Sequence, residues 1–203
     1  MLGLWKAPLY VTEQTLDALH RALPERLEKR LRGVEHIKAG QNFTIGDIEV
    51  RAFQIPHDAV DPVAFTFRAG GVKVSLLTDL GRLPRHVKVH MRDSDCLILE
   101  SNHDAEMLKF GPYPWVVKQR VLGTNGHLSN HIVSEYLADA DEFEGFDERA
   151  RYLVLAHLSL ENNNPHTARA SAEEALNRRP PEHAFHGELL VATQDQPMKP
   201  LEL

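Results

Sequence analysis

The sequence predicts a single α/β domain, because short apolar runs of strand length alternate with amphipathic stretches of helical length. Each apolar run is bounded by Pro, Gly or polar residues, as expected of buried strands. The chain of 203 residues is long enough to bury one core and shows neither an internal repeat nor an evident linker. We therefore expect residues 1–203 to form one domain, with about 180–203 as a C-terminal extension.

The first half of the chain is expected to hold two helices and then a run of strands. Thr12 is expected to cap a helix ending near Leu23, and Pro24 suits the first turn of a second helix over 24–31. Gly46 marks a turn, and Gly70-Gly71 marks a hairpin. The expected strands are 4–11, 48 to about 55, 63–67 and 72–77.

The second half is expected to alternate strands with capped helices. Asp104, Ser129 and Asn164-Pro165 have the residue types that begin helices. The acidic stretch 139–148 is interpreted as a solvated connection. The expected strands are 96–100, 152–156 and 188–193, and the expected helices are 83–92, a short one after Asp104, 115–122, one after Ser129 and one from about 164.

Composition places the chain among ordinary globular proteins, with 42% hydrophobic and 26% charged residues. The formal net charge of −6 argues against a strong sequence-independent grip on nucleic acid, although a locally basic groove stays open. The single cysteine, Cys96, lies in an apolar run and is expected to be reduced and buried. No run approaches the roughly 18 apolar residues of a membrane span, so we expect a cytoplasmic protein without a membrane partner.

Three strand tips carry residues that could bind a metal. His57, Asp79 and His157 each follow a short apolar run, at the position where a strand meets the edge of its sheet. Two imidazoles and a carboxylate on rigid strands are suitable metal ligands. The competing interpretation is that each residue only caps a turn.

A second pair of residues could transfer protons. Glu100 ends another buried strand, and His127 lies in a Gly-containing turn before a helix, where free backbone N–H groups favour an anion. A carboxylate beside a histidine, near an activated water, can protonate a leaving group. Alternatively, Glu100 is a paired structural residue and His127 a turn residue.

Several longer strings resemble a known family, the metallo-β-lactamase-fold hydrolases, and within it the bacterial YycJ-like (WalJ-like) branch. They occur in the order of that family and cover most of residues 40–165. The strings are Pro56-His-Asp-Ala-Val-Asp-Pro62, Thr78-Asp-Leu-Gly81, Leu99-Glu-Ser-Asn-His-Asp104, Gly111-Pro-Tyr-Pro114, Gly126-His-Leu-Ser-Asn130 and Ala156-His-Leu-Ser-Leu-Glu-Asn-Asn163.

The resemblance implies a role for each matched position. It implies that His57, Asp79 and His157 are metal ligands, with Asp79 bridging two divalent ions, zinc or in some members manganese. It implies that Glu100 and His127 act beside the scissile phosphate of a nucleic acid, DNA or RNA. The remaining matched residues are expected to support the ligands from outside the first shell: Asp58, Asp61 and His103.

The chain departs from the family at one hallmark, because the string His-x-His-x-Asp-His does not occur in its 203 residues. We therefore expect a partial αββα sandwich that lacks N-terminal strands of its first sheet. Such a chain should expose an apolar sheet edge. Because too few ligands remain for two ions, we expect weak metal binding and little activity from the isolated chain.

Three functions follow from these observations. The first is a metal-dependent phosphodiesterase or nuclease that uses a water activated by two metal ions. The second is a metal-free, non-catalytic remnant or interaction module. The third is a hydrolase of small phosphodiesters or other esters, because this fold supports many chemistries.

Overall fold

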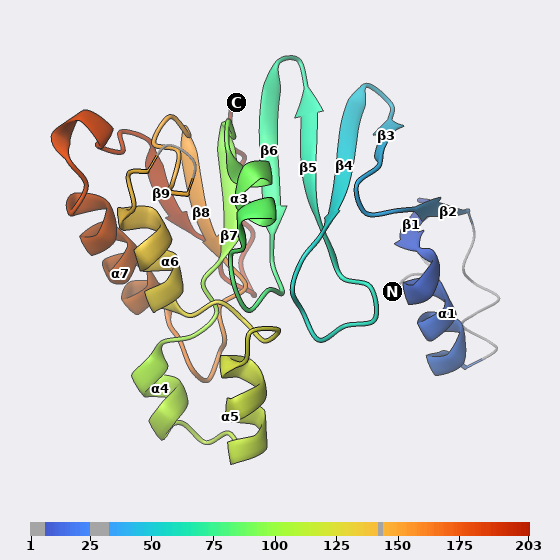
Figure 1. Cartoon of the computed structure of the whole chain (residues 1–203), viewed down its shortest axis with the longest axis horizontal. Helices are drawn as coiled ribbons and strands as arrows, with labels where there is room; N and C mark the ends of the chain where they lie inside the picture. The colour runs from blue at the N-terminus through green and yellow to red at the C-terminus, as the bar shows by residue number, and fades with distance from the viewer. Residues whose placement is uncertain (1–6, 25–32, 142–143) are drawn as a thin grey trace.

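The computed structural model describes residues 7–24, 33–141 and 144–203 and is built on a seven-stranded mixed sheet (Figure 1). Neighbouring strands are antiparallel from β3 to β6 and parallel from β6 to β9. Two further strands, β1 (Leu9–Thr12) and β2 (Val34–Ile37), pair in parallel as a separate small sheet. In sheet order the seven strands are β3 (Asn42–Ile45), β4 (Ile48–Gln54), β5 (Val63–Ala69), β6 (Val72–Leu77), β7 (Cys96–Glu100), β8 (Tyr152–Ala156) and β9 (Glu188–Val191).

Helices connect the parallel strands, as a parallel crossover requires. Among the described residues, the first crossover contains one helix, the second three and the third one, besides a 3-10 turn over Pro181–His183. None of the described helices is long and apolar enough to cross a membrane. The helices are α1 (Glu13–Ala22), α3 (Arg85–Met91), α4 (Ala105–Phe110), α5 (Trp115–Leu122), α6 (Asn130–Ala138) and α7 (Pro165–Asn177).

The main core lies between one face of the sheet and helices α3, α6 and α7. Leucines at alternate positions of β7 and β8 point to this face and are almost completely buried. The helices contribute Val87 and Met91 from α3, Val133, Tyr136 and Leu137 from α6, and three alanines from α7. Small side chains on α7 let it pack closely against α6.

The opposite face of the sheet is also apolar but less covered. Phe65, Phe67, Val74, Leu76 and Ile98 are half-buried on this face, beside the buried side chains of Val50, Ala52, Cys96 and Val154. The exposed apolar sheet edge expected from the sequence stays a prediction. The partial αββα sandwich stays a prediction, while the α/β class is confirmed.

Most expected elements are confirmed, including the hairpin at Gly70-Gly71 and the helix caps at Asp104 and Ser129. The proposed helix over 24–31 falls outside the described residues except at Pro24. Strands β2 and β3 were not predicted, because each has only four residues and little burial to impose a pattern. The connection 139–148 is not wholly solvated, because Phe146 is 3% exposed and packs against Tyr136 and Phe185.

The guanidinium of Arg179 holds this connection against the end of α6. It donates hydrogen bonds to the carbonyl oxygens of Leu137, Asp139, Phe146 and His183 at 2.6–3.1 Å, and an ion pair joins it to Glu148 at 2.8 Å. The Arg179 side chain is fully buried. Five contacts to one planar group use the fork geometry that only arginine offers.

We predict that Arg179→Lys destabilises the protein, because an ammonium group cannot reach all five acceptors and leaves buried carbonyls unpaired. The expected loss is about 3 kcal/mol in the free energy of unfolding. Urea denaturation measures it, with Arg178→Lys as the control, because Arg178 is exposed next to it. Equal stability of the two variants would contradict this account of Arg179.

Candidate metal centre

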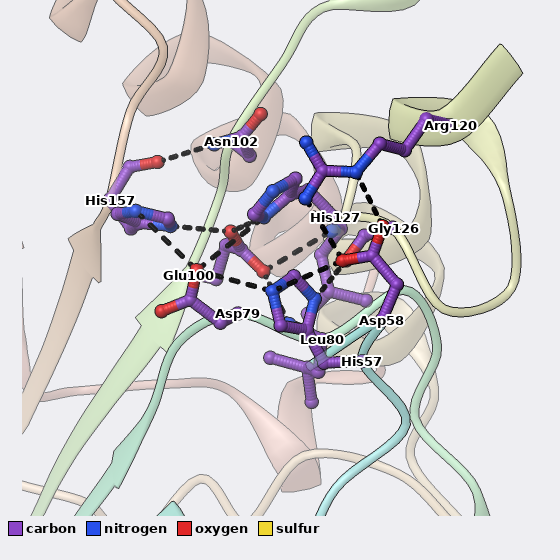
Figure 2. A network of polar contacts seen from close by, with 11 residues as sticks. His57, Asp58, Asp79, Leu80, Glu100, Asn102, Arg120, Gly126, His127 and His157 are labelled. Atoms are coloured by element: carbon purple, nitrogen blue, oxygen red, sulfur yellow. Dashed lines mark hydrogen bonds and ion pairs between the residues drawn. The ribbon is translucent and has the colours of Figure 1, made fainter. Parts of the chain in front are cut away.

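Four side chains from three strand ends and one loop meet at the carboxyl edge of the parallel strands (Figure 2). Asp79 follows β6, Glu100 ends β7, His157 follows β8, and His127 precedes α6. These parallel strands are in register, with Leu77 opposite Leu99 and Glu100 opposite Ala156, so their tips emerge together. The potential ligand atoms of the four residues all lie within 4.8 Å of one another.

The carboxylate of Glu100 is the centre of this cluster and is fully buried. Its Oε1 accepts hydrogen bonds from Nδ1 of His127 and Nδ1 of His157, each at 2.7 Å. Its Oε2 accepts from the backbone N–H groups of Leu80 at 3.0 Å and Leu128 at 3.3 Å. Four donors therefore compensate for the cost of burying this charge.

These contacts fix the tautomers of three histidines. A carboxylate and a carbonyl only accept hydrogen bonds, so Nδ1 carries the proton in His127 and His157 and also in His57, whose Nδ1 lies 3.1 Å from the Gly126 carbonyl oxygen. The lone pair of Nε2 is then free on each ring. A histidine held through one nitrogen with the other available is the usual arrangement of a metal ligand.

The pKa values follow from the same contacts. Burial favours the neutral form of Glu100, but the hydrogen bonds from His127, His157 and the Leu80 N–H outweigh it and lower the pKa of this carboxyl. The hydrogen bond to Glu100 is the main reason that the pKa of His157 is raised. The centre therefore holds a negative charge that stabilises positive charge on its neighbours.

Asp79 faces His57 and His157. Its carboxylate oxygen Oδ1 could bind the same cation as their Nε2 atoms. Its Oδ1 lies 3.7 Å from Nε2 of His157 and 3.8 Å from Nε2 of His57. Both Asp79 (φ 61°) and His157 (φ 56°) have left-handed backbone conformations, which are rare outside glycine. Such conformations cost of order 1–3 kcal/mol and concentrate at functional sites.

A buried network of amides ties the loops of the centre together. Ser101 Oγ donates to Asn130 Oδ1 at 2.7 Å, and Asn163 Nδ2 donates to Asn130 Oδ1 and to the Ser101 carbonyl at 2.9 and 2.8 Å. Asn102 Nδ2 donates to the carbonyl oxygen of His157 at 2.9 Å. These contacts connect the end of β7, the start of α6 and the loop that follows β8.

The other residues expected to support the ligands lie in different surroundings. Asp58 lies 3.5 Å from Nε2 of His57 through its Oδ1, and a two-pronged ion pair with Arg120 lowers the pKa of this carboxyl (Figure 2). Asp61 lies outside the cluster, where its carbonyl oxygen is near the Thr15 hydroxyl.

His103 is buried, and in the described part of the structure its ring nitrogens have no hydrogen-bond partner. Burial lowers the pKa of His103 to about 4, which keeps the ring neutral.

Sequence reasoning missed the contributions of Arg120 and of the backbone N–H groups of Leu80 and Leu128. No local pattern marks Arg120, whose partner Asp58 is 62 residues away. Asn102 lies within one of the strings that resemble the family. An asparagine in that string does not by itself indicate that its side chain binds the loop of His157.

The donor set suits a divalent ion such as zinc. Zinc takes imidazole nitrogens and carboxylate oxygens, and its catalytic sites combine three protein ligands with an open position. Asp79, His127 and His157 offer such donors within the cluster, and Nε2 of His57 lies outside it at 3.8 Å from Asp79 Oδ1. Both oxygens of Glu100 already accept hydrogen bonds. The residues present therefore fit a metal ion.

Comparison with known proteins identifies the family of the chain. The family described as Beta-lactamase superfamily domain matches residues 3–158. Exodeoxyribonuclease YycJ of Bacillus anthracis is 33% identical over 174 residues, which are 85% of this chain and 62% of that protein. Exodeoxyribonuclease WalJ of Streptococcus pneumoniae strain D39 is 35% identical over 156 residues, 76% of this chain and 55% of that protein. The chain thus spans 62% and 55% of the length of these curated relatives.

Solved structures show the same fold. The metallo-beta-lactamase fold protein YhfI from Bacillus subtilis superposes with a TM-score of 0.62 and 17% identity, covering 91% of this chain and 61% of that one. Zinc-bound PqqB from Methylobacterium extorquens has a TM-score of 0.61 and 18% identity, covering 94% of this chain and 65% of that one. Together with the family match, these findings establish that the chain belongs to the metallo-β-lactamase superfamily.

Proposed function

We propose that this chain is a metal-dependent phosphodiesterase that acts on DNA. The observation that carries the proposal is the buried Glu100 carboxylate, which binds Nδ1 of His127 and of His157 and leaves both Nε2 atoms free, in a cluster with Asp79. The similarity to two proteins described as exodeoxyribonucleases supports DNA as the substrate. RNA and small phosphodiesters are the other substrates to compare.

The metal ligands in this proposal are Asp79, His57 and His157. They contribute one carboxylate and two imidazoles, with Asp79 within 4 Å of both rings. A bound zinc or manganese ion supplies an activated water and charge neutralisation at a phosphoryl oxygen. As the family resemblance implies, the proposal expects two bound ions.

In this proposal His127 is the general acid, which protonates the leaving group through its Nε2. Its Nδ1–H donates to Glu100, so the buried carboxylate stabilises the imidazolium that forms when Nε2 takes up a proton. Nε2 can then donate this proton to the leaving oxygen of a phosphodiester. Glu100 acts through the two histidines and is a positioning residue, because its four hydrogen bonds leave it no free face toward a substrate.

One observation favours a second function, an interaction module without catalysis. The string His-x-His-x-Asp-His is absent from the sequence, and the ligands of the proposal are only Asp79, His57 and His157. We propose that the isolated chain turns over slowly for this reason. A metal-binding measurement separates the two functions, because an interaction module needs no metal.

We predict that Glu100→Gln weakens zinc binding by about 10- to 100-fold. The glutamine amide donates where the carboxylate accepts, so it cannot satisfy both histidines and both backbone N–H groups. Calorimetric titration with zinc, at a temperature where circular dichroism shows the variant folded, measures the change. The matched control is Glu182→Gln, because Glu182 is exposed. Unchanged zinc affinity in folded Glu100→Gln would contradict the positioning role.

We predict that His127→Gln lowers the rate of DNA hydrolysis by about 10²- to 10⁴-fold while the zinc content stays the same. The reason is that the variant loses the proton donor but keeps Asp79, His57 and His157. The assay uses a labelled DNA oligonucleotide with zinc or manganese, and elemental analysis reports the metal. His131→Gln is the control, because the His131 side chain is 74% exposed.

The same assay tests the proposed function as a whole. Slow hydrolysis that a chelator abolishes supports it, and an RNA oligonucleotide and a cyclic phosphodiester in parallel reactions identify the preferred substrate. Hydrolysis that continues in chelator, or a variant His127→Gln with full activity, would overturn the proposed mechanism.

A further inference from the structure

Helices α4 and α5 form a helical hairpin between two residues of the centre. The hairpin, residues 105–122, begins five residues after Glu100 and ends five residues before His127. In Figure 1 the two helices lie together beyond the sheet, on the side where β6, β7 and β8 end. A surface on this hairpin is therefore continuous with the candidate centre.

The hairpin exposes large apolar side chains. Phe110, Trp115 and Val116 are 75%, 67% and 75% exposed, whereas Leu108 and Val121 are buried and anchor the two helices. Exposed aromatic rings at the rim of a site are a common mark of a binding surface. Neither ring is used by the centre described above.

Basic side chains are interleaved with these rings. The hairpin carries Lys109, Lys118 and Arg120 against one acidic residue, Glu106, in a chain whose net charge is −6. The Lys109 ammonium lies 5.0 Å from the centre of the Phe110 ring, and Lys118 donates to the Lys109 carbonyl oxygen at 2.7 Å. The ion pair of Lys109 with Glu106 is exposed at 3.8 Å and therefore weak. Because Arg120 is paired with Asp58, Lys109 and Lys118 are the cations that this surface offers to a polyanion.

Two contacts join the hairpin directly to the centre. Arg120 pairs with Asp58, which follows the candidate ligand His57 (Figure 2). The Val121 carbonyl oxygen accepts the His127 N–H at 3.0 Å. These contacts hold the end of α5 against the loops that carry His57 and His127.

We propose that the hairpin binds a single-stranded segment of DNA, with bases stacked on Trp115 and Phe110 and phosphates near Lys109 and Lys118. An exposed ring can stack on an unpaired base, but the base faces of a duplex are already covered by their neighbours. The choice of DNA as ligand rests on the proposed function. The hairpin then delivers a flexible strand to the edge of the sheet, where His127 and His157 lie.

The test measures binding without turnover. A fluorescein-labelled oligothymidine of about twelve nucleotides is titrated with the full chain in EDTA, and anisotropy gives the dissociation constant. Trp115→Ala is expected to weaken binding roughly 5- to 150-fold, the range for one stacked base. Val89→Ala is the control, because Val89 is an exposed apolar residue of α3, and its affinity should equal that of the wild type.

Charge reversal tests the phosphate contacts independently. Lys109→Glu should weaken binding and reduce its dependence on salt, because fewer counterions are released. Lys199→Glu makes the same change in net charge at an exposed position near the C-terminus and should have a smaller effect. Equal effects of the two reversals would overturn the placement of the strand on the hairpin.

Other results would also overturn the proposal. Unchanged DNA affinity in Trp115→Ala would do so, as would tighter binding of a blunt duplex than of the single strand. A Trp115→Ala variant with altered oligomeric state but normal DNA affinity would assign the surface to protein contact instead.

A site variant separates this proposal from the proposed function. Asp79→Asn should keep single-strand binding in EDTA but lose hydrolysis in the presence of metal. If the wild-type chain binds the strand through Trp115 yet never hydrolyses DNA, the hairpin proposal stands and the phosphodiesterase proposal fails. If hydrolysis of DNA depends on Asp79 but Trp115→Ala binds normally, the reverse holds.

Discussion

The structure of the candidate centre depends on one buried carboxylate. Glu100 is ionised inside the fold, and four donors from three different segments must reach it together. Burying an ion costs several kcal/mol unless its hydrogen bonds are complete. The ends of β6, β7 and β8 and the loop before α6 are thereby held in one arrangement. The two bonds from Nδ1 also set the tautomers of His127 and His157, so these rings are oriented for ligand binding once the chain has folded.

This constraint explains features that are costly by themselves. Asp79 and His157, with left-handed backbones, follow the ends of β6 and β8, and His157 donates from there to the Glu100 carboxylate at the end of β7. The amide network of Ser101, Asn130 and Asn163 fixes the loops that carry the histidines. By contrast, the 105–122 hairpin is attached at the edge and leaves its aromatic rings in solvent. The strand ends and the amide network hold the candidate ligands in place. The exposed 105–122 hairpin is the part of the structure that we propose contacts a long substrate.

Much of this arrangement could be predicted from the sequence, because it depends on local patterns. The polar residues at strand tips, the helix caps at Asp104 and Ser129 and the hairpin glycines all act within a few residues. The contacts of Leu80, Leu128 and Arg120 could not be predicted, since they join segments that are 20–62 residues apart and use backbone or unmarked side chains. Phe146 was misjudged because its acidic neighbours hid one buried ring.

The most direct test of the metal-centre claim is anomalous X-ray diffraction at the zinc absorption edge, from crystals of the chain grown with zinc. The account predicts an anomalous peak in contact with the Asp79 carboxylate and the Nε2 of His157, with Glu100 still hydrogen-bonded to both histidines. A fully occupied zinc elsewhere on the chain with none at Asp79, or a Glu100 carboxylate that ligates the metal directly and releases His127, would contradict it.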